Sequence, residues 1–143
     1  MFEVLGEDNK IRERIIRGIF GLIGKWKKRR RILLLALYGS FARGDWKPGS
    51  DIDLLIVIED PPKTYWERWD EFFGIIEDFP IDPHVYSPSE FLSLLKDGRM
   101  TPLDALTEGI VLFKEDKFFE EIKRILREVL RHRVKIGNAW FPK

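Results

Sequence analysis

The sequence has no cysteine, only two histidines and only two methionines among its 143 residues. Without cysteine there are no disulfides and no thiolate metal sites, and two histidines make a zinc site a poor fit. No apolar run approaches the roughly 20 residues that cross a bilayer. The N-terminal residues are charged and lack the apolar core of a signal peptide. We therefore expect a cytoplasmic protein without a membrane anchor.

The chain also lacks an excess of charge of either sign, because 25 Lys and Arg residues face 24 Asp and Glu residues. This balance does not indicate a general nucleic-acid binder, so no nucleic acid is required as a partner. The densest basic stretch, residues 25–31, fits a helix end whose cations complement the helix dipole. A contact with RNA or with an acidic partner is the alternative, and the sequence leaves both open.

Hydrophobic residues make up 44% of the chain, enough for one sizeable core and a single domain over residues 1–143. The apolar periodicity predicts helices over 9–30, 64–78, 88–96, 101–108 and 117–136, and strands over 32–38, 52–58, 80–86 and 109–114. This order predicts the α/β (α+β) class, a mixed β-sheet with helices packed on it. The core is expected over about 10–115, followed by an amphipathic helix over about 117–136. Trp66 and Trp69 are expected in the core.

One motif joins two of the predicted strands. Gly39-Ser40 follows the strand 32–38, and Asp51 and Asp53 open the strand 52–58, with ten residues between the two pairs. Residues i and i+2 of a strand face the same side, so the two carboxylates are expected side by side. Like charges so close are costly unless a cation lies between them. Mg²⁺ takes such oxygen ligands together with phosphate oxygens. An isolated Asp-x-Asp is usually turn chemistry, but the preceding Gly-Ser turn favours metal-dependent nucleotide chemistry.

The spacing resembles the signature of the nucleotidyltransferase superfamily, which contains DNA polymerase β and the kanamycin nucleotidyltransferases. Both halves of a longer pattern, residues 39–44 and 50–55, are similar to the minimal nucleotidyltransferases, some of which act as antitoxins. The resemblance implies the nucleotidyltransferase fold, with helices on one side of the sheet. It also implies ATP as substrate, and two Mg²⁺ ions held by three carboxylates on neighbouring strands.

The resemblance assigns Asp51 and Asp53 as the first two catalytic, metal-binding carboxylates. Asp82 is the candidate for the third, because the segment Pro88-Ser89-Glu90 follows its strand as in the family, and Asp78 is its rival. Pro83 departs from the family pattern. It removes a ladder hydrogen bond and so suggests an edge strand.

The resemblance further implies that Gly39 and Ser40 bind the nucleotide phosphates and that Arg43, about one helical turn later, reaches a phosphate. Lys47 is a weaker candidate for the same role. His84 alternates with Asp82 and would lie on the same face, where it contacts the nucleotide or acceptor or has only a structural role.

The function that follows is transfer of AMP from ATP to a hydroxyl group, on a partner toxin of the HEPN type that the chain silences as an antitoxin. Two alternatives stay open. One is a non-catalytic module that binds a nucleotide or partner. The other is a small-molecule nucleotidyltransferase of the aminoglycoside-modifying kind, which would need an acidic acceptor groove including Glu67, Asp70 and Glu71. The sequence does not decide the oligomeric state, and a homo-oligomer is compatible with it.

Overall fold

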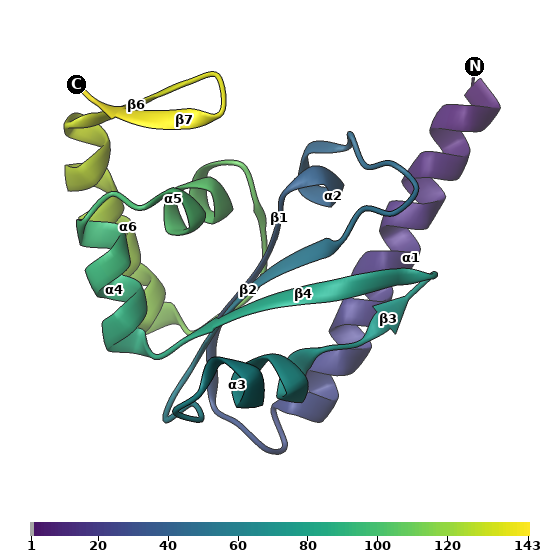
Figure 1. Cartoon of the computed structure of the whole chain (residues 1–143), viewed down its shortest axis with the longest axis horizontal. Coiled ribbons are helices and arrows are strands. Elements are labelled where there is room, and N and C mark those ends of the chain that lie inside the picture. The colour runs from purple at the N-terminus through teal and green to yellow at the C-terminus, as the bar shows by residue number, and fades with distance from the viewer. Residues whose placement is uncertain (1) are drawn as a thin grey trace.

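The computed structural model describes residues 2–143, with side chains described from residue 10 onward. It contains a five-stranded mixed sheet of order β3-β4-β2-β1-β5 and a separate two-stranded sheet, β6-β7 (Figure 1). The strands are β1 (Ile32–Tyr38), β2 (Ile52–Ile58), β3 (Ile75–Ile76), β4 (Phe79–Tyr86), β5 (Ile110–Lys114), β6 (Arg133–Ile136) and β7 (Ala139–Pro142). The helices are α1 (Phe2–Trp26), α2 (Ser40–Arg43), α3 (Tyr65–Phe72), α4 (Pro88–Lys96), α5 (Met100–Thr107) and α6 (Asp116–Arg131). The predicted fold class is confirmed.

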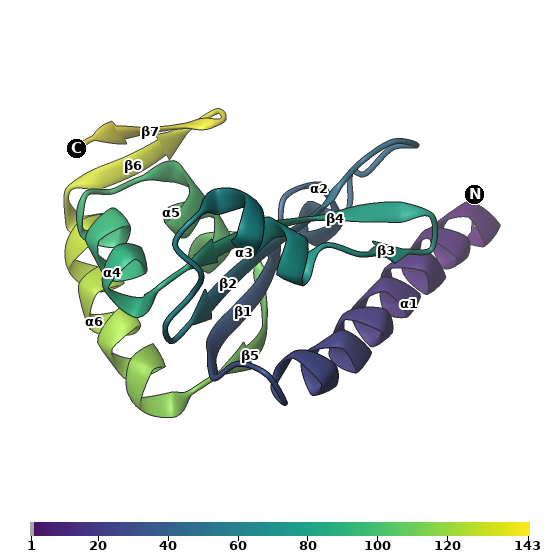
Figure 2. The ribbon, with the colours of Figure 1, turned by 60° about the horizontal axis from the view of Figure 1, so that its bottom comes forward.

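Helices cover both faces of the sheet, which corrects the expectation that they pack on one side. Alternate residues of β1 point to opposite faces, so Leu35 and Leu37 contribute to one core cluster while Leu34 and Ala36 contribute to another. The first cluster is completed by α1, α2 and α3, and the second by α4, α5 and α6. Figures 1 and 2 show α1 and the α4–α6 group on opposite sides of the strands. A central strand buried on both faces explains the continuous apolar run of β1.

The region predicted as a helix over 64–78 contains a shorter helix and a hairpin. Helix α3 is capped by the Thr64 side chain and ends at Phe72. The chain then forms β3 and turns back into β4 through Glu77 and Asp78, both with positive φ. Two central residues with positive φ are the mark of a type I′ hairpin turn, which usually contains Asn or Gly. Because Glu77-Asp78 is not a typical sequence for this turn, the turn was not predicted. The apolar spacing then extended the predicted helix to residue 78.

The aromatic residues of α3 are a second correction. Trp66 was expected in the core but is 71% exposed. Trp69 is only half-buried. The buried aromatic residue of this helix is Phe72, which packs edge-on against Trp26 of α1. A helix of two turns presents only a narrow stripe to the sheet, and here Phe72 occupies it.

The predicted C-terminal helix ends earlier than expected. Helix α6 stops at Arg131, and 133–142 form the β6-β7 hairpin. Its two-residue turn is Gly137-Asn138, with Gly137 at φ 62°, a pattern of the type II′ turn. The hairpin folds back on α5, where Asp104 accepts hydrogen bonds from Lys135 Nζ and Trp140 Nε1, each at 2.9 Å. The alternation of Val134 and Ile136 with charged residues indicates a strand. It was overlooked because the helical periodicity of the preceding residues continues into it.

Within the described residues, no helix combines the length and apolar composition that crossing a membrane requires.

Candidate active site

Three adjacent strands bring a row of polar side chains to one end of the sheet. Tyr38 near the end of β1 lies opposite Asp53 of β2, and Asp53 lies opposite Asp82 of β4. Residues paired in register share a face of the sheet. The strand β2 runs antiparallel to β1 and parallel to β4, so the end of β1 meets the beginnings of β2 and β4. Residues far apart in the sequence thus become neighbours.

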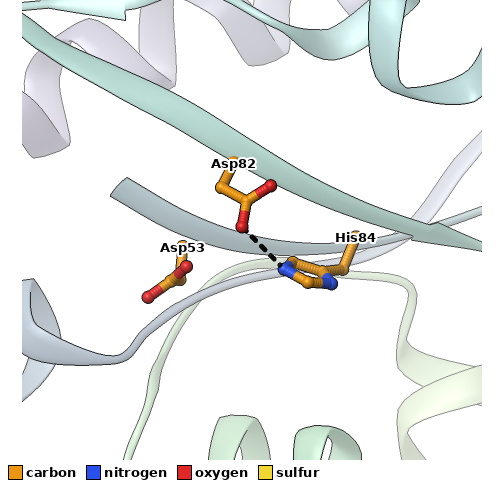
Figure 3. Close-up of side chains that lie close together, drawn as sticks. All are labelled: Asp53, Asp82 and His84. Atoms are coloured by element: carbon orange, nitrogen blue, oxygen red, sulfur yellow. Dashed lines mark hydrogen bonds and ion pairs between the residues drawn. The ribbon is translucent and has the colours of Figure 1, made fainter. Parts of the chain in front are cut away.

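The carboxylates of Asp53 and Asp82 converge with the imidazole of His84 (Figure 3). One ligand atom from each of the three lies within 4.8 Å of the others. Nε2 of His84 lies 3.2 Å from Oδ2 of Asp82. All three residues are half-buried. The predicted positions Asp53 and Asp82 are therefore brought together. The hypothesis that Pro83 marks an edge is also supported, because β3 pairs with β4 only at Phe79 and Pro80, before Pro83.

The electrostatics of this row favour a cation. Burial, and next the charge of Asp82, raises the pKa of Asp53 to about 6. Burial and then Asp53 also raise the pKa of the Tyr38 hydroxyl well above its usual range. Both shifts report a site where another negative charge is unfavourable and a positive charge is favoured. Two carboxylates and an imidazole are suitable donors for a divalent cation, so these residues fit the metal that the predicted chemistry needs.

Asp51 is not part of the strand that carries Asp53. Strand β2 begins at Ile52, and Asp51 is exposed just before it. Among the residues that the structure describes, the converging group comprises Asp53, Asp82 and His84, without Asp51. That the Asp51 and Asp53 side chains pair on one side of the strand therefore stays a prediction. After burial and the charge of Asp82, the charge of Asp51 also contributes to the raised pKa of Asp53, and its role as a ligand stays a prediction.

Asp78, the rival third carboxylate, occupies the hairpin turn between β3 and β4 and does not belong to the converging group. His84 was weighed from the sequence but left out of the predicted ligand set. The alternation of Asp82 with His84 on one strand was the signal that placed it on this face.

Gly39 joins the phosphate-binding motif to the carboxylates. It has φ 73° and ψ −152°, a conformation that only glycine adopts readily. A Cβ atom at this position would overlap Oδ2 of Asp53. The glycine therefore serves both the sharp turn from β1 into α2 and the close approach of the Asp53 carboxylate. The Gly-Ser and Asp-x-Asp halves of the motif touch in space.

Helix α2 carries the other predicted nucleotide-binding residues. Ser40 is its first residue and Arg43 its last. Nε of Arg43 donates to Oδ2 of Asp45 at 3.2 Å, and the Arg43 side chain is 46% exposed. An exposed ion pair of this kind contributes little free energy, so the guanidinium can leave it for a phosphate. The guanidinium of Arg12 on α1 donates a hydrogen bond to the carbonyl of Ala42 and so links α2 to α1.

A family model for the nucleotidyltransferase domain matches residues 21–136 of the chain. The protein therefore belongs to the nucleotidyltransferase domain family. A solved structure described as a toxin-antitoxin with AMP-PNP is similar at 16% sequence identity and a TM-score of 0.43, over 71% of this chain and 73% of that one. So low a similarity carries no argument about activity or partner. No curated protein matches the chain significantly in sequence.

Proposed function

We propose that the chain transfers AMP from ATP to a hydroxyl group on a HEPN-type partner protein, as the antitoxin of a toxin–antitoxin pair. The observation that carries the transfer reaction is the convergence of Asp53 and Asp82 beside Gly39, at the end of the sheet where Ser40 begins α2. The choice of AMP and of the partner rests on the resemblance of residues 39–44 and 50–55 to the minimal nucleotidyltransferases.

In the proposed reaction the acceptor oxygen attacks the α-phosphorus of ATP and the bond to the bridging oxygen breaks. Pyrophosphate leaves with the electron pair, and the acceptor hydroxyl gives its proton to water. Asp51, Asp53 and Asp82 would hold two Mg²⁺ ions, which polarise the attacking hydroxyl and neutralise the leaving group when bound. Ser40 and Arg43 would hold the β- and γ-phosphates, and Gly39 would let the backbone approach them. Asp82 lies nearest the open edge of the sheet, where an acceptor can enter.

A partner protein as acceptor is supported by an exposed aromatic surface on and after α3, formed by Tyr65, Trp66, Trp69 and Phe73. Tyr65, Trp66 and Phe73 are 58%, 71% and 41% exposed, and consecutive rings lie 5.6, 6.0 and 4.4 Å apart. Contiguous exposed aromatic side chains on a soluble domain are typical of protein interaction sites.

This surface leads to a prediction about partner binding. Trp66→Ser should change the free energy of unfolding by less than about 0.5 kcal/mol, because the side chain is mostly in water. It should weaken binding to the partner at least about tenfold, since exposed tryptophans dominate such interfaces. Phe20→Ser on α1, where Phe20 is 50% exposed, is the matched control. Chemical denaturation measures the stability of each variant, and isothermal titration measures its affinity for the partner. Equal affinities for the two variants would argue against the α3 surface.

The proposed function is tested by incubating the protein with α-labelled ATP and Mg²⁺ in three ways: alone, with the product of the neighbouring reading frame, and with an aminoglycoside. Label on the neighbour together with released pyrophosphate is the expected result. Tight binding of an unlabelled neighbour would favour the non-catalytic binding module instead. Label recovered on an aminoglycoside and not on protein would favour the small-molecule enzyme.

A further inference from the structure

We propose that His84 is a direct ligand of the cation held by Asp53 and Asp82, so that this site prefers Mn²⁺ to Mg²⁺ more strongly than an all-carboxylate site does. The inference rests on the proposed function in one respect, that Asp53 and Asp82 bind a divalent cation. It adds a nitrogen donor that the Gly-Ser and Asp-x-Asp signature does not contain.

The positions of the three side chains fit a shared ion. Asp82 and His84 are two residues apart on β4 and so face the same side, with Asp53 opposite Asp82 on β2. Neighbouring ligands of an octahedral ion with bonds of about 2.1 Å lie about 3 Å apart. Nε2 of His84 and Oδ2 of Asp82 are 3.2 Å apart, which matches one edge of such an octahedron. Asp53 offers a carboxylate oxygen within 4.8 Å of one ligand atom of each of these two residues.

The imidazole also packs against an aromatic ring of the neighbouring part of the sheet. The ring of Tyr38 meets the ring of His84 edge-on, with centroids 5.8 Å apart. Tyr38 itself is opposite Asp53 across the β1-β2 pair. The His84 and Asp82 side chains keep 28% and 35% of their surface exposed. The site is therefore preformed on three strands but open to water and to phosphate oxygens, which would complete the coordination.

The nitrogen donor determines the expected metal preference. Mg²⁺ is a hard ion that prefers oxygen ligands and binds through few protein carboxylates. Mn²⁺ is a transition ion and gains more from a nitrogen donor than Mg²⁺ does, although it binds such sites more weakly than Fe²⁺ or Co²⁺. Replacing one oxygen donor by His84 should thus favour Mn²⁺ over Mg²⁺. The competing arrangement is a hydrogen bond in which His84 only orients Asp82, and in that case the imidazole stays outside the first coordination sphere.

Electron spin echo spectroscopy of bound Mn²⁺ distinguishes the two arrangements, since a coordinated imidazole nitrogen gives a resolved ¹⁴N coupling. The chain has only two histidines, and His132 is 75% exposed at the end of α6. We expect the coupling in the unmodified protein and in His132→Gln, and its loss in His84→Gln. Mn²⁺ affinity should fall about tenfold or more in His84→Gln, with Mg²⁺ affinity from competition changing less than about threefold.

Bound Mn²⁺ without any ¹⁴N coupling in the unmodified protein would overturn the assignment, whether or not His84→Gln folds. Equal losses of Mn²⁺ and Mg²⁺ affinity in a folded His84→Gln would also overturn it. Failure of the proposed function has a different signature, which is a protein that binds Mn²⁺ with the ¹⁴N coupling but transfers no AMP.

Discussion

Replacing Asp53 by Asn should reduce AMP transfer at least about a thousandfold while leaving the fold intact. The Asp53 carboxylate lies at the centre of the row formed with Tyr38 and Asp82, and the proposed cation site includes it. Groups that stabilise the transition state directly have effects of this size when removed. Asn has the same shape, and its neutral amide removes a like charge from beside Asp82. The thermal unfolding midpoint should therefore not fall.

The measurement is label transfer from ATP together with Mn²⁺ binding, which needs no acceptor. Asp116→Asn is the matched control, because Asp116 is exposed in the first turn of α6, beyond β5 and outside the converging group. Asp82→Asn should behave as Asp53→Asn does. Activity within tenfold of the unmodified protein in a folded Asp53→Asn variant would exclude the proposed catalytic centre.

Gly39→Ala is the second substitution with a large expected effect. A Cβ atom here would overlap the Asp53 carboxylate, and the backbone angles are unfavourable for alanine. Strain of this kind costs about 1–3 kcal/mol. Displacing Asp53 by about 1 Å should also lower transfer about a hundredfold. Both losses arise from one added methyl group.

Gly21→Ala is the control that separates the clash with Asp53 from a general effect of replacing glycine by alanine. Gly21 lies in α1, and a Cβ atom added there would meet no neighbouring element within 4 Å, so alanine should stabilise the helix by about 0.5–1 kcal/mol. Chemical denaturation and label transfer on both variants make the comparison. A Gly39→Ala protein with unchanged stability and activity would show that the close packing of Gly39 on Asp53 is dispensable.

Much of this protein is encoded locally and can be predicted from the sequence. Seven consecutive apolar residues specify β1, and they can be recognised because a central strand is buried on both faces. Ser87 and Glu90 form the capping box that starts α4, a pattern that spans only four residues. The Gly39-Ser40 and Asp51-Ile52-Asp53 pairs, with their fixed spacing, likewise indicate the family without tertiary information.

The apolar periodicity gave wrong helix ends where a helix and the hairpin after it share one apolar pattern. The hairpin at Glu77-Asp78 and the hairpin after Arg131 both continue the spacing of a preceding helix, so the helices were predicted too long. In the first, the turn lacks its usual residues. In the second, Gly137-Asn138 was available as a signal, but the amphipathic pattern of α6 outweighed it. Contacts of Lys135 and Trp140 with Asp104 stabilise that hairpin, and such long-range contacts are invisible to a local pattern.

By itself the sequence determined the family, the order of most strands and helices, and Asp53 with Asp82 as candidates. Only the tertiary structure decided which candidates meet. Strand register places Asp53 beside Asp82, adds His84 to them, and leaves Asp51 exposed before the strand. Register depends on how β1, β2 and β4 pair across the sheet, and pairing between distant segments is set by the packing of both core layers, because no local spacing specifies it.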